Sequence, residues 1–163
     1  MSIRNLAELG KNLKNIMTRL ISNQNLIKLL YYTDPNPLNG KDLSKDEIDK
    51  LIFNKLIKIV PRVGPLDNET NIVTIRVMGG DRNIDNTDFR TINIAIDIFV
   101  PLTQWIIVGE DLRIFAIIGE IEKSLNGKNV TGIGKLEETG FELTLVTDEM
   151  SGYTIDFEVQ NYE

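Results

Sequence analysis

The acidic side chains with the clearest potential for chemistry lie in one polar loop near the middle of the chain. Asp81, Asp85 and Asp88 could supply carboxylate oxygens to a hard cation such as calcium, which takes several such ligands from a flexible loop. Their spacing does not match a calcium-binding loop, and the positive charges of Arg82 and Arg90 oppose a cation there. We therefore expect a loop that is solvated or that contacts another protein, since loops of this length are often functional.

Two further patterns fall short of a catalytic site. Residues 127–132 begin like a phosphate-binding loop, but Ile133 and Gly134 stand where lysine and then serine or threonine are required. Glu137 and Glu138 are adjacent, so in extended structure their side chains point apart and cannot form a glycosidase pair. We interpret these glutamates as surface charge near a turn at Gly140 that can reach neighbouring proteins.

The chain contains no histidine and no cysteine. This composition removes disulfides, thiolate chemistry and the imidazole on which most acid–base devices and zinc sites depend. Carboxylate, lysine and hydroxyl groups remain, but no set of them converges on a reaction. We predict that the protein is not an enzyme and binds no cofactor or metal.

The net charge of −6 is divided unevenly along the chain. Residues 1–62 hold 11 basic and 6 acidic side chains, a net +5, whereas residues 63–163 hold 7 basic and 18 acidic ones, a net −11. Such a division favours charge-guided docking between copies or onto another protein, although it can also serve solubility alone. The overall acidity argues against indiscriminate binding to nucleic acid.

The apolar segments are too short to cross a membrane, and charged and polar residues interrupt the N-terminus where a secretion signal needs an apolar core. We expect a soluble protein made in the cytoplasm. A length of 163 residues favours a single domain.

Apolar spacing predicts three helices in residues 1–55. An apolar stripe recurs every three or four residues over 3–21, a second short helix follows Asn23 or Asn25 as its cap, and prolines end that helix. Ser44 and Glu47 form a capping box, so a third helix should begin there and run to about Asn54.

Residues 56–163 read as a strand-rich core that contains one helix. Strands are predicted at 56–60, 73–77 and 92–100, with the polar loop (residues 79–88) between the last two. Trp105 is the only tryptophan; it could anchor an interface or lie partly buried in the core. Asp111 should cap a helix over 111–125, with a stop at Asn126-Gly127.

Three more strands follow, at 130–136, 141–145 and 153–159, with turns at Gly140 and Ser151-Gly152. The order predicts a single α+β domain over 1–163, built on antiparallel sheet with helices packed on one side and an N-terminal helical segment.

The order of features resembles the tail-terminator, or tail-completion, proteins of the tailed-bacteriophage neck. The features that carry the likeness are the Leu-Leu-Tyr-Tyr segment ending at Tyr32, the Pro-Arg-Val turn at Pro61, the alternating run 94–101, Trp105, and Gly-Ile-Gly-Lys-Leu at 132–136 before the closing hairpin. The resemblance covers most of residues 26–159.

The resemblance implies a virion protein that assembles as a ring, commonly a hexamer, on the end of the tail tube and joins it to the head connector. DNA would pass through the lumen without specific binding, which suits an acidic strand surface. We expect the polar loop and the Glu137–Glu138 turn to contact tube or connector proteins, and Arg113 and its helix to take part in ring contacts. The alternatives are a head-completion (stopper) or other tail adaptor protein, or a non-viral cytoplasmic ligand-binding domain.

Overall fold

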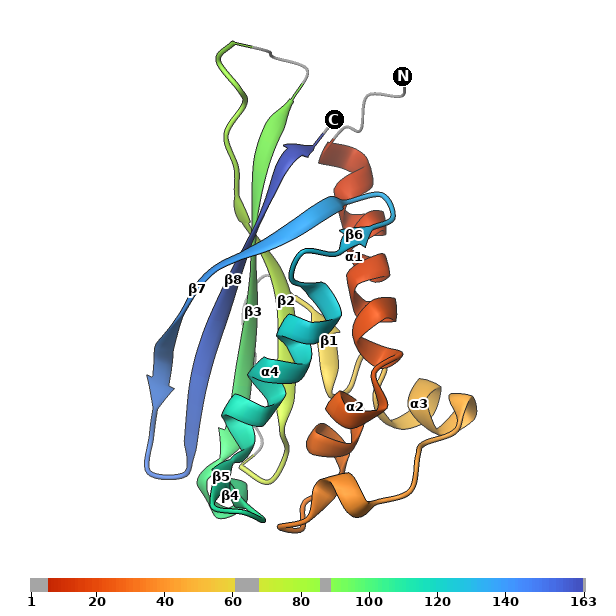
Figure 1. The fold of residues 1–163 in the computed structure, drawn as a ribbon, viewed down its shortest axis with the longest axis vertical. Helices are drawn as coiled ribbons and strands as arrows, with labels where there is room; N and C mark the ends of the chain where they lie inside the picture. The colour runs from red at the N-terminus through yellow and green to blue at the C-terminus, as the bar shows by residue number, and fades with distance from the viewer. Residues whose placement is uncertain (1–5, 61–67, 86–88, 163) are drawn as a thin grey trace.

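The computed structural model describes residues 6–60, 68–85 and 89–162. The architecture is α+β: helices α1, α2 and α4 lie on one face of a curled six-stranded sheet (Figure 1). The predicted fold class is confirmed, including the N-terminal helical segment.

The first two helices form where the apolar spacing predicts them. α1 (Leu6–Ile21) buries one stripe against the sheet, and α2 (Gln24–Tyr31) begins at the predicted cap, because Asn23 Oδ1 accepts a hydrogen bond from Leu26 N at 3.1 Å. The buried residues of the two helices are Leu9, Leu13, Ile16, Met17, Leu20, Leu26, Ile27, Leu29 and Leu30.

The short helix η1 (Pro37–Asn39) leads to α3 (Lys45–Leu51), which has the predicted capping box. Ser44 N donates to Glu47 Oε2 at 2.7 Å, and Glu47 N donates to Ser44 Oγ at 3.3 Å. The helix ends three residues before Asn54. That residue adopts a left-handed conformation with a φ of 58°, which asparagine tolerates better than most residues, so the chain turns there into the first strand.

The sheet has the strand order β1-β2-β3-β8-β7-β6. Its strands are β1 (Ile57–Ile59), β2 (Ile72–Gly79), β3 (Arg90–Pro101), β6 (Asn129–Val130), β7 (Gly134–Val146) and β8 (Met150–Tyr162). β3 is central and pairs with β2 on one side and β8 on the other.

One pairing differs from the antiparallel sheet that we predicted. β1 runs parallel to β2, with Ile57 opposite Val73, while the other neighbouring strands in the sheet are antiparallel. A parallel neighbour requires a longer connection than a hairpin turn, and residues 60–71 separate β1 from β2 in the chain. The expected turn at Pro61 lies outside the described residues.

The segment between β3 and α4 contains a helical turn and a small hairpin. After η2 (Leu102–Gln104), β4 (Ile106–Ile107) pairs with β5 (Asp111–Leu112). Asp111 therefore lies in a strand and does not cap α4 (Arg113–Leu125), whose N-cap is Leu112 without a side-chain bond. The predicted apolar face of the helix is confirmed, since Ile114, Ile117, Ile118, Ile121 and Leu125 are all buried.

Two expected turns near the C-terminus are strand instead. β7 continues through Gly140 with a register shift between Glu138 and Gly140, and β8 already includes Ser151 and Gly152. The turn lies at residues 147–149, where Thr147 N donates to Met150 O at 2.9 Å. The predicted strand 130–136 is the short β6–β7 hairpin, because Gly132 at a φ of +78° reverses the chain.

Gly152 has a packing role near the start of β8. A Cβ there would lie 2.6 Å from Phe99 Cδ1 and 3.2 Å from the Ile98 carbonyl oxygen. The Phe99 ring, which is 5% exposed, therefore occupies the space that a larger residue would need.

Candidate interaction surfaces

The polar loop extends the β2–β3 ladder beyond the sheet. Asp81 N donates to Thr91 O at 3.1 Å, Thr91 N donates to Asp81 O at 2.7 Å, and Asn83 N donates to Phe89 O at 2.9 Å. The backbones of Arg82 and Arg90 pair in an isolated antiparallel β-bridge. What we expected as an irregular loop is a hairpin that projects from the body of the molecule (Figure 1).

This projecting hairpin carries most of the contact residues expected in the loop. Asp81, Arg82 and Asp85 are exposed and Arg90 is half-buried, while Asp88 lies outside the described residues. Sequence reasoning missed Ile84, which is 93% exposed.

Arg113 is not at the surface, contrary to our expectation that it contributes to a contact between subunits. Its exposed fraction is 0%, and its side chain donates four hydrogen bonds to backbone carbonyls of distant segments. The acceptors are Gln104 O at 2.9 Å, Leu29 O at 2.7 Å, Tyr32 O at 2.8 Å and Asp34 O at 2.7 Å. Burial lowers the pKa of the guanidinium, and the nearby Asp34 partly opposes that shift. Arg113 therefore joins α4 to the end of α2 and to η2.

Trp105 is partly buried and packs against the hydrophobic core. Its backbone completes the corner that precedes α4: Trp105 N donates to Leu102 O at 3.3 Å, and Trp105 O accepts from Arg113 N at 2.8 Å. This position matches the interpretation that Trp105 lies partly buried in the core, not the one that it anchors an interface.

Glu137 and Glu138 lie within β7, not in a turn. Glu137 is exposed, pairs across the ladder with Glu158 and forms an ion pair with Lys135 at 2.9 Å. Glu138 N donates to Asn126 Oδ1 at 2.9 Å. The strand continues because the glycine that we took as a turn signal is part of a β-bulge.

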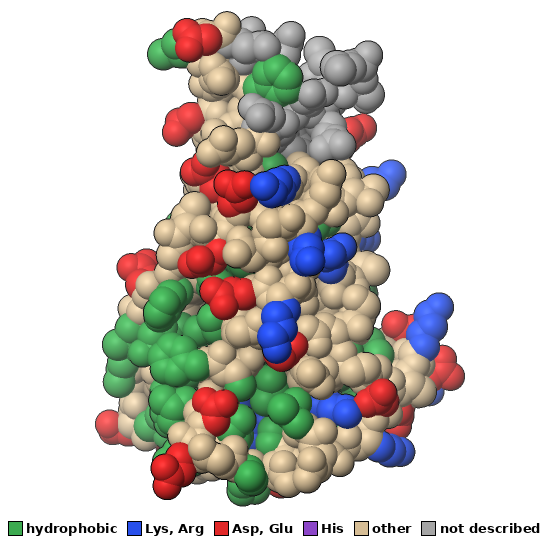
Figure 2. Space-filling view, in the orientation of Figure 1, with side chains coloured by type: hydrophobic (Ala, Val, Ile, Leu, Met, Phe, Trp, Pro, Cys, Tyr) green, Lys and Arg blue, Asp and Glu red, His purple; other side chains and the backbone are tan. Residues whose placement is uncertain are grey.

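A cluster of apolar side chains, exposed except for the half-buried Tyr153, lies at the end of β7 beside the first turn of α4. We call it the aromatic patch, and its members are Phe115, Phe141, Leu143, Val146 and Tyr153. The three rings contact one another at centroid distances of 5.2 to 6.4 Å. Figure 2 shows hydrophobic side chains gathered on this side of the molecule. Phe141 and Leu143 alternate with polar residues in the predicted strand 141–145, and they are 56% and 52% exposed.

The sheet face opposite the helices holds a buried carboxylate whose bonds are all made within the chain. Asp97, 2% exposed, accepts from Thr74 at 3.0 Å, from Thr154 at 2.6 Å and from Arg76 at 2.7 and 3.1 Å. This hydrogen bond to Asp97 raises the pKa of Arg76. Both carboxylate oxygens are occupied, so Asp97 is a structural link between strands and not a free base.

The same face is acidic toward β7. Burial, with the negative charge of Glu142 next in importance, raises the pKa of Asp156, and the positive charge of Arg76 partly opposes this. Among the described residues, no group of acidic side chains is arranged to hold a metal ion. No helix in the described part of the chain is long and apolar enough to cross a membrane.

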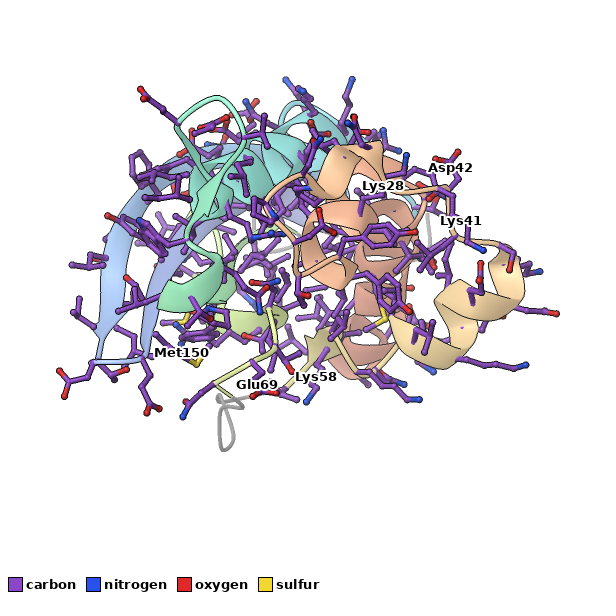
Figure 3. The ribbon with its side chains drawn as sticks, turned by 90° about the horizontal axis from the view of Figure 1, so that it is seen from below. Lys28, Lys41, Asp42, Lys58, Glu69 and Met150 are labelled. Atoms are coloured by element: carbon purple, nitrogen blue, oxygen red, sulfur yellow. The ribbon has the colours of Figure 1, made fainter. Side chains whose placement is uncertain are left out.

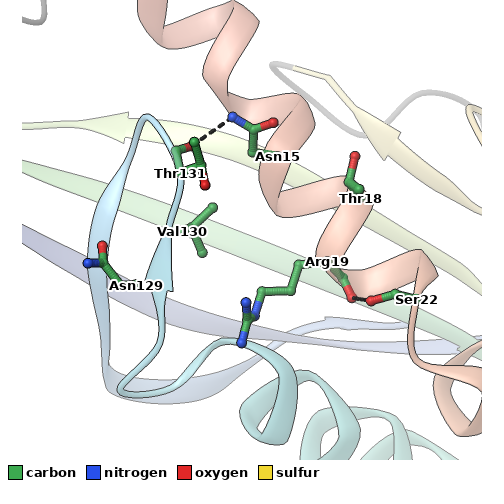
Figure 4. A pocket seen from close by; sticks show the side chains of 7 residues that line it. All are labelled: Asn15, Thr18, Arg19, Ser22, Asn129, Val130 and Thr131. Carbon is green, nitrogen blue, oxygen red and sulfur yellow. Dashed lines mark hydrogen bonds between the residues drawn. The ribbon is translucent and has the colours of Figure 1, made fainter.

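Two hollows in the described surface have linings with few charged side chains. A groove of about 270 Å³ lies between α1 and the β6–β7 turn, where Asn15 Nδ2 donates to Thr131 O at 2.7 Å (Figure 4). A second hollow of about 200 Å³ lies beside Asn71, a buried residue whose Nδ2 donates to Gln104 Oε1 at 2.8 Å. Their linings are neutral amides, hydroxyls and apolar groups, together with Arg19 in the groove and Glu69 in the hollow.

The YomW family model matches residues 23–159. The chain belongs to the YomW family. The family name comes from an SPbeta-like prophage, so a phage origin is indicated for the YomW domain. No curated protein matches the chain.

Proposed function

We propose that this YomW-family chain is a structural subunit of the phage neck that caps the tail tube and joins it to the head connector. The observation that carries the proposal is the aromatic patch, an unpartnered apolar surface in a phage-derived domain. Surfaces of this kind mark contacts between proteins. The projecting hairpin supplies a second surface, at one end of the long strands, for a tube or connector neighbour.

The acidic face of the sheet is compatible with a lumen through which DNA slides. Asp156, Glu142 and Glu158 lie on strands β7 and β8 away from the helices, and negative charge repels phosphate groups. A neck subunit acts by fitting surfaces, so it needs no catalytic residues.

The test is binding of the purified chain to isolated tail tubes and, separately, to DNA-filled heads of its phage, followed by co-sedimentation and electron microscopy. A tail terminator binds one end of the tubes and stops their growth. Binding to heads alone assigns the chain to the stopper class, and binding to neither refutes a role in the neck.

Variants of the projecting hairpin sharpen this test. The double variant Arg82→Glu with Ile84→Asp should lose binding to tubes or heads, because both side chains are exposed on the hairpin. Lys128→Glu, an exposed charge reversal after α4, is the matched control and should bind as the wild type does. Unchanged binding by the hairpin variant would remove the hairpin from the proposal.

A further inference from the structure

Two stretches of the chain that contain no acidic residue lie side by side in the fold. Residues 9–33 hold four basic side chains and residues 123–136 hold three, and neither stretch contains aspartate or glutamate. Asn15 Nδ2 donates to Thr131 O at 2.7 Å, and Arg19 Nε donates to Ser124 O at 2.5 Å, which joins positions 116 and 105 apart in the sequence. A chain with a net charge of −6 therefore gathers positive charge in one place.

The groove between α1 and the β6–β7 turn lies at this junction, and Arg19 is the charged group that lines it (Figure 4). Arg19 is half-buried, and the bond from its Nε to the Ser124 carbonyl fixes the plane of the guanidinium. Within the described part of the chain, the two Nη groups of Arg19 and the side chains of Asn129 and Thr131 make no hydrogen bond. A guanidinium held in this way presents a planar fork of donors to an oxyanion.

Three of the seven basic side chains in the two stretches are paired with acidic ones and add no net charge. The pairs are Lys123 with Glu120 at 2.7 Å, Lys135 with Glu137 at 2.9 Å, and Lys28 with Asp42 at 2.7 Å, the last of which Figure 3 shows. The other four have no acidic partner among the described residues, and we call them the basic groove: Lys11, Lys14, Arg19 and Lys128.

The two lysines of α1 lie on the face of the helix that lines the groove. Lys11 precedes Asn15 by four residues and Lys14 precedes Thr18 by four, and residues at this spacing are neighbours on a helix surface. Both lysines are exposed. The α1 wall of the groove is therefore a row of cations.

This row has the length of several phosphate groups. At a rise of 1.5 Å per residue, the helix advances about 12 Å from Lys11 to Arg19. One strand of duplex DNA carries about three to four phosphates over that distance. Lys128, exposed and next to Asn129 in the opposite wall, adds a cation across the groove. A free phosphate would meet only one part of this row.

The size and lining of the groove favour contact with a backbone. Its volume is about 270 Å³, whereas pockets that enclose a whole drug-sized ligand begin at roughly 300 Å³. The groove therefore admits one small charged group of a larger ligand. No aromatic side chain is among the described residues that line it, so it offers no platform on which bases could stack.

We infer that the basic groove binds the phosphate backbone of DNA, independently of base sequence. The Arg19 fork holds one phosphate, and the lysines attract its neighbours along the strand. This inference goes beyond the proposed neck role and does not rest on it. The groove lies on the helix side of the sheet, whereas Asp156, Glu142 and Glu158 lie on the opposite face, so DNA is held on one side and repelled on the other.

Fluorescence anisotropy with a labelled duplex of about 20 base pairs tests the inference over a range of salt concentrations. With four phosphate contacts, the logarithm of the binding constant should fall against the logarithm of salt concentration with a slope of about −3.6. Affinity should then fall roughly a hundredfold between about 50 and 200 mM salt.

The double variant Lys14→Glu with Lys128→Glu removes one cation from each wall of the groove. The slope should drop to about −1.8, and binding at about 50 mM salt should weaken at least tenfold. The matched control is Lys50→Glu with Lys55→Glu, which makes the same change in net charge at exposed positions in and after α3 and should keep the slope of the wild type. Circular dichroism checks that both double variants are folded.

Four results would overturn the inference. They are a wild-type chain that does not bind the duplex at about 50 mM salt and roughly 100 μM protein, a groove variant that binds as the control does, a mononucleotide that binds as tightly as the duplex, and polyglutamate that binds more tightly than the duplex. The last two would assign the groove to a single phosphate or to an acidic protein segment. Tail tubes contain no free duplex, so Lys128→Glu should still bind them as the wild type does, and failure of either proposal leaves the other standing.

Discussion

Replacing Arg113 with methionine should destabilise the protein more than any ordinary surface change. The methionine keeps most of the buried stem but leaves four backbone carbonyls without their donors. At roughly 2 kcal/mol for each unpaired buried group, the loss approaches 8 kcal/mol. The change to methionine also removes the cost of burying the guanidinium charge. That cost is several kcal/mol and offsets about half of the loss. The expected net loss is therefore about 4 kcal/mol of unfolding free energy.

Urea denaturation monitored by circular dichroism measures this loss, since a domain of this size has only about 5–15 kcal/mol to lose. The control is Lys123→Met on the same helix. Lys123 is 72% exposed and pairs with Glu120 at 2.7 Å, so its removal should cost less than about 1 kcal/mol. If Arg113→Met unfolds at the same urea concentration and with the same slope as Lys123→Met, the four hydrogen bonds do not hold the fold together as we argue.

Two further predictions concern the sheet. Gly152→Ala should lower the unfolding free energy by about 1–3 kcal/mol, because the new Cβ meets the buried Phe99 ring. Gly119→Ala in α4 is the control: its Cβ meets nothing within 4 Å, so it should raise the unfolding free energy by about 0.5–1 kcal/mol. Equal effects of the two variants in thermal denaturation would contradict the packing argument. Asp156→Asn should stabilise the protein at neutral pH. Because the pKa of Asp156 is raised in the folded protein, ionisation of this carboxyl weakens the fold. The stability that the protonated carboxyl contributes is therefore complete below its ordinary pKa of 3.8, and it is lost as pH rises through the higher pKa of the folded state. Solvent screening keeps this gain below about 1 kcal/mol, and urea titrations at pH 7 and pH 3 should show it at pH 7 only.

The sequence predicts the helices well because their signals are local. The apolar stripe of α1 and the apolar face of α4 depend only on spacing along a few turns. Both are buried as expected, except for Leu6 at the start of α1, which is 54% exposed. The caps at Asn23 and Ser44 depend on residues three positions away, and both form.

The errors arise where a residue's surroundings come from distant parts of the chain. Arg113 was expected to take part in ring contacts, but its side chain is buried and its hydrogen-bond acceptors are contributed by residues 29–34 and by Gln104. The parallel direction of β1 depends on the connection to β2, and the bulge at Gly140 depends on local pairing with β8. The spacing of apolar residues within one strand specifies neither. Phe141 alternates with polar residues as a core-facing strand residue does, yet it stays 56% exposed although Phe115 of α4 contacts its ring.

The central strand gives the molecule a mechanical property. β3, with 12 residues, spans roughly 40 Å, and it runs from the projecting hairpin to η2 with hydrogen-bonded ladders on both sides. A pull along its axis at the hairpin loads the bonds of both ladders in shear, so they resist together and do not open one at a time. The hairpin and the opposite end of the strand are therefore mechanically coupled, so that tension applied at one end is carried along β3 to the other.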